Sequence, residues 1–274
     1  HEMLKAVAIH SANDATVALA EKIAGSEDVF VSMMNEKARE LGLKNTNYLD
    51  CTGLTDEGHY STAYDIAVLS RELINRYPKI LDYTKIWTDT FRNGQFALNN
   101  TNKLIRHYSG TVGLKTGFTS KAGYCLSAVV KRDNLTLISV VLGAPDSNTR
   151  FAETRKLQDY GFANFEHTVL ETKNTEVGPI EVRKGIDMEV QGIIKEDVTV
   201  MLKKGSKERI ERRMNLEPYL TAPVEAGQKV GEITYILDGN EIAKVEVVTA
   251  QAVEKASFIK LFIRMVLEWF GINK

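Results

Sequence analysis

The sequence predicts an α/β (α+β) domain over residues 1–167, a small all-β domain over residues 168–252, and an amphipathic C-terminal helix over residues 253–274. Three observations support this division. Helical and strand patterns alternate up to about residue 165, whereas strand patterns alone recur from about Thr168. The tail then returns to a helical pattern with regularly spaced charges. A chain of 274 residues is also long enough for two domains with separate cores.

The opening residues, HEMLKAVAIH, have the apolar spacing of a helix but no capping residue before it. We therefore expect that part of the same domain lies upstream of His1 and is missing from this chain. A second helix is expected from Asn13 to Gly25, with Asn13 or Asp14 as its N-cap and Gly25 as its stop.

Two more helices follow in the first domain. One starts at Ser26, carries acidic residues in its first turn and ends before Gly42, as the helix dipole favours. The other is capped by Ser61 and closes before Pro78, because the residue before a proline disfavours the helical conformation.

Strand patterns come next. Asn93-Gly94 between two apolar runs predicts a hairpin with a two-residue turn. Residues 110–119 and 123–144 predict three strands, the last two joined at Asp133-Asn134. Residues 147–165 then predict a long amphipathic helix.

The second domain begins near residue 167. Short alternating runs recur over about 80 residues, the size of a small sandwich or barrel. Asp238-Gly239-Asn240 marks a turn between two of these strands.

The tail has a narrow polar stripe formed by Lys260, Arg264 and Glu268, and the remaining positions are largely apolar. A membrane-spanning helix needs about 20 apolar residues, more than this run supplies. We therefore expect an interfacial helix that lies on a membrane surface. The alternative is a helix that docks on its own β-domain.

Composition excludes several classes of protein. The formal net charge of −1 disfavours a nucleic-acid-binding protein, which would usually be basic. The five histidines are scattered, and Cys51 and Cys125 have no metal-ligand spacing, so we expect no metal and no cofactor. The two cysteines are expected to be small buried side chains, with a single disulfide left open.

Two polar motifs are the candidate functional residues: Ser11-Ala12-Asn13 at the junction of two helices, and Lys115-Thr116-Gly117 in a strand. Alone, each is weak evidence. Helix capping explains most S-x-N triplets, and K-T-G could be any exposed strand end. Together, one at a helix junction and one on a strand, they match two motifs of the penicillin-recognising serine enzymes, whose other motif is S-x-x-K.

On these motifs and the stretches around them, such as GLKTGFTSKAGYCLSAVV, the chain resembles a low-molecular-mass penicillin-binding protein, a serine-type D-alanyl-D-alanine carboxypeptidase. The resemblance extends over essentially the whole chain, including the β-rich domain and the amphipathic tail. It implies a penicillin-recognising transpeptidase/β-lactamase-like fold for the first domain.

The resemblance also implies roles for individual residues. Ser11 helps to pass a proton to the leaving amine, and Asn13 contacts the substrate amide and the catalytic lysine of S-x-x-K. Lys115 supplies a fixed positive charge. Thr116 binds the terminal carboxylate, and Gly117 leaves room for a substrate lying along the strand edge.

Two further substrate-binding positions follow from the same resemblance. The family's oxyanion hole uses the backbone N–H of the residue after K-T-G, here Phe118, where close relatives often have histidine. Arg150, on the helix after the strands, occupies the place of an arginine that assists carboxylate recognition. An ordinary surface arginine is the equally weighted alternative.

The family's S-x-x-K motif is the main departure. The only match, Ser257 to Lys260, lies in the tail helix and is interpreted as a chance match. We therefore expect an incomplete catalytic domain that is inactive alone. Its exposed apolar surface should be covered by the missing N-terminal segment or by a second copy of the chain.

The expected function is a carboxypeptidase that removes the terminal D-Ala from peptidoglycan pentapeptides through an acyl-enzyme, at the outer face of the bacterial cytoplasmic membrane. β-Lactams would be covalent inhibitors of the intact enzyme. The alternative is a non-catalytic module that binds peptidoglycan or a wall-synthesis partner. A β-lactamase is less favoured, because no loop with a deacylating glutamate is identifiable.

Overall fold

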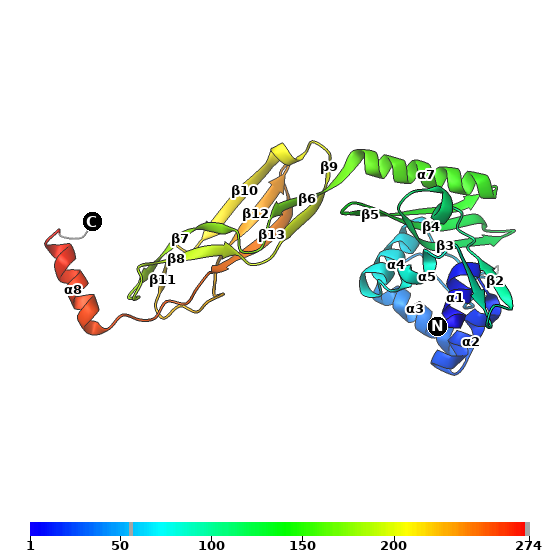
Figure 1. The fold of residues 1–274 in the computed structure, drawn as a ribbon, viewed down its shortest axis with the longest axis horizontal. Coiled ribbons are helices and arrows are strands. Elements are labelled where there is room, and N and C mark those ends of the chain that lie inside the picture. Colours follow the sequence, from blue (N-terminus) through cyan, green and yellow to red (C-terminus); the bar gives the residue numbers. More distant parts are fainter. Residues whose placement is uncertain (55–56, 272–274) are drawn as a thin grey trace. The chain divides into compact units, whose positions relative to one another are not determined.

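The structure is a computed structural model that describes residues 1–54 and 57–271 (Figure 1). It divides into two compact units, His1–Ala163 and Asn164–Lys274. The division falls a few residues before the expected position near residue 167, because the chain from Phe165 onward already forms a strand of the second unit.

A three-stranded antiparallel sheet forms the centre of the first unit, in the order β3-β4-β5. Its strands, all three predicted, are β3 Thr111–Thr119, β4 Gly123–Arg132 and β5 Leu135–Ala144. Arg132 pairs with Leu135, which confirms the two-residue turn at Asp133-Asn134. Because β3 lies at the edge of the sheet, part of its backbone is open to other partners.

Helices cover both faces of this sheet (Figure 1). On one face lies α4, Ala63–Arg76, and the Ser70 hydroxyl is 2.8 Å from that of Ser127 on β4. On the other face lies α7, Ser147–Asn164, where Phe151 packs in one cluster with Leu126 and Ala128. Alternate residues of β4 therefore serve the two faces, as strand geometry requires.

The other helices of the first unit are short or lie toward the N-terminus. They are α1 Glu2–Lys5, the π-helix η1 Ala6–His10, α2 Asn13–Ala24, α3 Glu27–Glu40, α5 Ile80–Thr84 and α6 Leu104–His107.

Helix capping follows the prediction at one position and departs from it at two. The Ser26 hydroxyl accepts a hydrogen bond from the Val29 N–H, as predicted. The N-cap of α2 is Ala12 rather than Asn13 or Asp14, so this helix start has no side-chain cap. At α4 the cap is Thr62, not Ser61, because the Ser61 hydroxyl is engaged with Thr46 instead.

The predicted hairpin forms from β1, Thr88–Phe91, and β2, Phe96–Asn99. The prediction of a two-residue turn at Asn93-Gly94 was wrong: Phe91 pairs with Phe96, so the loop has the four residues 92–95. Arg92, Asn93 and Gly94 all have positive φ, which uses the conformational freedom of Gly94.

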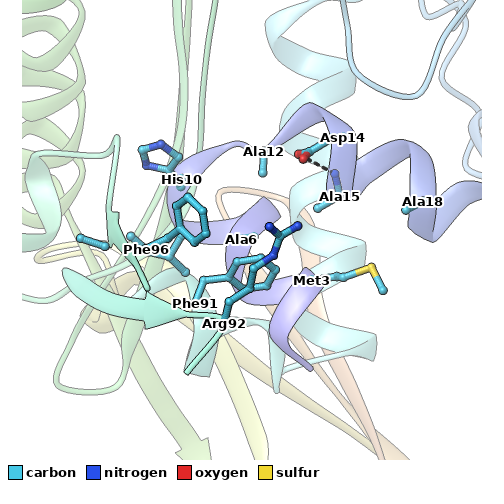
Figure 2. A pocket seen from close by; sticks show the side chains of 12 residues that line it. Met3, Ala6, His10, Ala12, Asp14, Ala15, Ala18, Phe91, Arg92 and Phe96 are labelled. Carbon is cyan, nitrogen blue, oxygen red and sulfur yellow. Dashed lines mark hydrogen bonds between the residues drawn. The ribbon is translucent and has the colours of Figure 1, made fainter. Parts of the chain in front are cut away.

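The hairpin packs against the N-terminal helices and leaves an apolar pocket of about 450 Å³ between them (Figure 2). The helices contribute small side chains such as Ala12, Ala15 and Ala18, whereas the hairpin contributes Phe91 and Phe96. The described residues of the first unit leave the apolar lining of this pocket uncovered.

The second unit is all β, as predicted, apart from a 3₁₀ turn at Lys207–Arg209 and the tail helix. One sheet has the order β10-β12-β13-β8-β7-β11 and the other pairs β6 with β9. The strands are β6 Phe165–Glu171, β7 Glu176–Arg183, β8 Glu189–Ile194, β9 Val198–Lys203, β10 Ile210–Leu216, β11 Tyr219–Thr221, β12 Lys229–Leu237 and β13 Asn240–Thr249.

The core of this unit is a single cluster of aliphatic side chains that includes Ile194, Ile233 and Val247. Leu237 pairs with Asn240, which confirms the turn at Asp238-Gly239. Strand β10 was not predicted, since its largely exposed sequence IERRMNL lacks the alternation of a half-buried strand.

The tail forms α8, Phe258–Trp269, and residues 272–274 of the expected segment lie outside the described residues. Two cations of its polar stripe contact the β-domain: Arg264 donates to the carbonyls of Gly185 and Ile186, and Lys260 donates to that of Ile186. Most of its large apolar side chains are exposed, with Trp269 at 87%, whereas Leu261, Val266 and Leu267 are half-buried. Within the described residues, no helix combines the length and hydrophobicity needed to cross a membrane.

Candidate active site

Ser11 lies at a sharp reversal between two helices. The π-helix η1 ends there, and Ser11 adopts a left-handed conformation with φ 64° and ψ 42°, which is uncommon for a residue other than glycine. The N–H of Ala12 reaches back to the carbonyl of Ala6, six residues earlier. Short π-helical turns and such backbone outliers are both frequent at functional sites.

Lys115 on β3 joins this reversal to the sheet. Its Nζ donates to the Ser11 hydroxyl at 2.8 Å and to the Thr116 carbonyl at 2.7 Å. Two motifs that are 104 residues apart in sequence are therefore in direct contact. Both side chains are partly buried, so water screens this contact less than it would at the surface.

The same burial changes the acidity of Lys115. Removal from water disfavours the ammonium form and lowers the pKa of Lys115 from its ordinary value of 10.5 to about 8, and the positive charge of Arg150 acts in the same direction. A lysine with this pKa can both give and take a proton near neutral pH.

A cleft of about 460 Å³, here called the central cleft, opens beside this contact. The helical reversal and β3 contribute to its lining, and the loop at residues 51–54 and the start of β4 contribute the rest. Its lining residues are Val7, Ser11, Asn13, Thr16, Cys51, Thr52, Gly53, Leu54, Lys115, Thr116, Gly117, Phe118, Thr119, Ala122 and Cys125.

Asn13, Thr116 and Gly117 all lie in this cleft. Asn13 is the first residue of α2 and is exposed, so its amide is accessible. The Thr116 hydroxyl donates to that of Thr101 at 2.6 Å, which holds its orientation. A Cβ added at Gly117 would lie 3.7 Å from Cys125 Cβ, an ordinary contact, so the fold does not require glycine there.

Phe118 forms an exposed aromatic surface at the cleft. Its ring is 56% exposed and lies 4.3 Å from the Tyr124 ring, centroid to centroid. Successive side chains of a strand point to opposite faces, and Phe118 is three residues after Lys115. Its side chain therefore projects to the face opposite that of Lys115.

Arg150 is not placed for direct contact with a substrate carboxylate in the central cleft. It is only 6% exposed and does not line the central cleft. Its guanidinium donates to the carbonyls of Gly117 and Cys125 and packs against the Tyr124 and Phe151 rings. The equally weighted alternative, a surface arginine, does not fit either, since α7 holds this side chain against the sheet.

Sequence reasoning missed two contributors to the cleft, the 51–54 loop and Cys125, and also Thr101, whose hydroxyl holds that of Thr116. Cys125 could have been found from the strand register, since it pairs directly with Gly117. Cys51 and Cys125 are both free thiols. Burial, and then the neighbouring Glu27 carboxylate, raise the pKa of Cys51 to about 11. Among residues 1–54 and 57–271, no cluster of side chains is arranged to hold a metal ion.

Comparison with known proteins identifies both units. Residues 1–146 match the D-alanyl-D-alanine carboxypeptidase family, and residues 165–255 match the penicillin-binding protein 5 C-terminal domain. D-alanyl-D-alanine carboxypeptidase DacF of Bacillus subtilis is 40% identical over 98% of this chain and 70% of its own length. The corresponding values for DacC of Escherichia coli are 35%, 98% and 68%.

Solved structures agree with these relatives. Penicillin binding protein 5 from Haemophilus influenzae superimposes with a TM-score of 0.73 at 35% identity, over 92% of this chain and 74% of that one. A peptidoglycan synthesis regulatory factor (PBP3) from Streptococcus pneumoniae gives a TM-score of 0.74 at 30% identity, over 92% and 77% of the two chains.

The lowered pKa of Lys115 can be tested by titration. We expect its Nζ to titrate with a midpoint near pH 8, measured by NMR of the labelled amine. Arg150→Gln should move the midpoint upward, because one like charge is removed while burial remains. Arg155→Gln, an exposed change on the same helix, should leave it in place. A wild-type midpoint near 10.5 in the folded chain would contradict the burial argument.

The same shift has a consequence for stability. Between about pH 8 and 10.5 the folded chain has released a proton that the unfolded chain still holds. The contribution of Lys115 to the free energy of unfolding should therefore rise with pH across this window. Lys115→Met should remove that part of the pH dependence in denaturant titrations.

Proposed function

This chain belongs to the serine-type D-alanyl-D-alanine carboxypeptidases, the low-molecular-mass penicillin-binding proteins, and we propose that its central cleft binds the D-Ala-D-Ala end of the peptidoglycan pentapeptide. The single observation that carries this proposal is the 2.8 Å contact between Lys115 Nζ and the Ser11 hydroxyl. It holds a positive charge and a hydroxyl group at one end of an open strand edge.

The proposed roles of Ser11, Lys115 and Asn13 follow from which of their groups donate and which accept hydrogen bonds. Because Ser11 Oγ accepts from Lys115, its own proton is free to be donated to the leaving amine. The pKa of about 8 allows Lys115 to resupply that proton near neutral pH. The Asn13 amide can donate to one group and accept from another, which suits a contact with the substrate amide.

The substrate carboxylate is proposed to bind at Thr116, beside the Lys115 ammonium. Gly117 keeps the strand edge clear, and the Phe118 N–H is proposed to stabilise the oxyanion. Arg150 is proposed to act as a positioning residue, since its bonds to the carbonyls of Gly117 and Cys125 brace the strand segment that carries these groups.

We further propose that these 274 residues alone form no acyl-enzyme. Their only Ser-x-x-Lys match lies in the second unit, where the Ser257 hydroxyl accepts from the Lys260 N–H at the start of α8. The Lys260 side chain donates to the Ile186 carbonyl. We propose that the apolar pocket beside the hairpin is the surface that a nucleophile-bearing segment, or a second copy of the chain, would cover.

We also propose that α8 attaches the protein to the outer face of the cytoplasmic membrane. Two cations of its polar stripe are held by its own β-domain, so its apolar side chains remain available. This arrangement favours an interfacial helix over one that docks through its apolar side.

The ligand assignment can be tested by NMR titration with a short peptide that ends in D-Ala-D-Ala. We expect Lys115→Met to weaken binding about ten-fold or more, the usual effect of losing a charge-assisted hydrogen bond. Lys131→Met, an exposed change on the same sheet, is the matched control and should bind as the wild type does. Equal binding of a peptide ending in D-Ala-L-Ala would count against a cleft selective for the D-configured end.

Acylation can be tested with a fluorescent penicillin. We expect no covalent adduct on this chain, measured by intact mass and gel fluorescence, because no serine in the central cleft has a lysine three residues later. Penicillin-binding protein D2 from Listeria monocytogenes, solved in an ampicillin-bound form, is a suitable positive control. If the chain is labelled, Ser257→Ala shows whether the tail serine is the one that reacts. Labelling of Ser257 or of any other serine would overturn the proposal.

Membrane attachment can be tested by co-sedimentation with phospholipid vesicles. Replacing the exposed Phe262 and Ile263 by aspartate should lower the bound fraction at least ten-fold, because each side chain contributes apolar area to the interface. Met201→Asp makes the same kind of change at another exposed site in the β-domain and should have little effect. Unchanged binding of the double variant would mean that α8 is not the anchor.

A further inference from the structure

A pocket of about 460 Å³ lies between α6 and α7 of the first unit, and it shares no lining residue with the central cleft. We call it the basic pocket, because Lys103, His107 and Arg155 line it. Lys103 directly precedes α6 and His107 is its last residue, so the two are four residues and about one helical turn apart. Their side chains therefore share one side of this short helix.

Helix α7 supplies the opposite wall of the basic pocket. Asn148, Ala152 and Arg155 follow the spacing i, i+4 and i+7, which places them on one face of this helix. The first N–H groups of α7 are already bound, since the Asp146 carboxylate accepts from those of Asn148 and Thr149. A ligand in the basic pocket would therefore meet side chains rather than the start of the helix.

The floor of the basic pocket is apolar and firmly held. Leu104 and Phe151 line it, and both belong to one core cluster in which they are almost fully buried. The buried Asn102 side chain accepts from the Leu104 N–H at 3.1 Å and donates to the Gly113 carbonyl at 3.2 Å, which ties α6 to β3. The two walls therefore stand on the same core, and the pocket is formed before any ligand arrives.

Lys103 and Arg155 place two permanent cations at the exposed rim of the basic pocket. Within residues 1–54 and 57–271, neither side chain forms an ion pair or a hydrogen bond, and no aspartate or glutamate lines the pocket. The acids on neighbouring turns of α7 have other partners: Asp159 accepts from the Tyr108 hydroxyl, and Glu153 pairs with a lysine of its own helix. The two cations are therefore available to an anionic ligand.

We propose that the basic pocket binds a phosphate monoester, either a small soluble ester or the headgroup of a lipid. A guanidinium and an ammonium group facing one space suit the dianionic phosphate better than a single carboxylate. The Asn148 amide and the His107 ring N–H add donors for the remaining phosphate oxygens. The pocket is larger than a phosphate group, and its apolar floor fits the short carbon chain of an ester. This site is additional to the D-Ala-D-Ala site of the proposed function and uses none of its residues.

The test is an NMR titration of the full chain with sn-glycerol 3-phosphate at low salt. We expect saturable shifts of the backbone amides of Leu104 and Ala152, which line the basic pocket. Arg155→Gln and Lys103→Met should each weaken binding about five-fold, the upper end of the range for a solvent-accessible ion pair. Added salt should weaken the binding to the wild type, because water reaches these ion pairs.

Three controls separate the basic pocket from general charge effects. Lys156→Gln removes the same charge from the next position of α7, outside the pocket, and should bind as the wild type does. Glycerate, a three-carbon carboxylate with one charge less, should bind more weakly than glycerol phosphate. Lys115→Met, or saturation with the D-Ala-D-Ala peptide, should leave glycerol phosphate binding unchanged, because the central cleft is a different site.

Vesicles of phosphatidylcholine, with and without phosphatidic acid, identify the source of the phosphate. If the ligand is a lipid headgroup, the wild type should co-sediment with phosphatidic acid vesicles more strongly than Arg155→Gln does, although both chains keep α8. If the two chains bind these vesicles equally while their affinities for glycerol phosphate differ, the ligand is a soluble ester.

Three results would overturn the phosphate assignment: no saturable binding of glycerol phosphate, equal binding by the wild type and both pocket variants, or displacement of glycerol phosphate by the D-Ala-D-Ala peptide. Equal affinity for glycerate would overturn the choice of phosphate as well. None of these results bears on the proposed function, because Arg155→Gln should leave the affinity for the D-Ala-D-Ala peptide unchanged.

Discussion

The contact between Lys115 and Ser11 is the constraint on which the site depends. It joins a helical reversal to the edge strand of the sheet, and neither element alone would form a cleft. Ser11 adopts a left-handed conformation at this contact, and the chain leaves one helix and enters the next within two residues. The hydrogen bond from Lys115 to the Ser11 hydroxyl therefore links the left-handed turn to the partly buried ammonium group.

Burial explains why this contact is chemically useful as well as structural. A lysine in water would be a permanent cation near neutral pH, whereas Lys115 is held near the point where it exchanges its proton. Arg150 contributes from the other face of the sheet, through its charge and through its bonds to strand carbonyls. An arginine behind a strand can therefore influence the central cleft without lining it.

The tail helix contacts its own β-domain through two cations of its polar stripe. An amphipathic helix on a soluble domain usually buries its apolar side, but here Arg264 and Lys260 are bound to backbone carbonyls of the β-domain. These two cations have their hydrogen-bond partners within the protein, and most of the large apolar side chains are left exposed. The sequence predicted the stripe, but periodicity alone could not decide which side of the helix meets the domain.

By itself, the sequence determined the fold class, most of the elements, the helix cap at Ser26, the turns at Asp133-Asn134 and Asp238-Gly239, and the two motifs. These features depend on local periodicity and residue chemistry, which are legible along the chain. Only the tertiary structure decided that Arg150 lies behind the sheet, that Cys125 and the 51–54 loop line the cleft, and that Thr62 displaces Ser61 as a cap. The physical reason is that a strand's two faces and a hydroxyl's choice among partners depend on register and packing between distant segments, and one residue of register exchanges every side chain between faces.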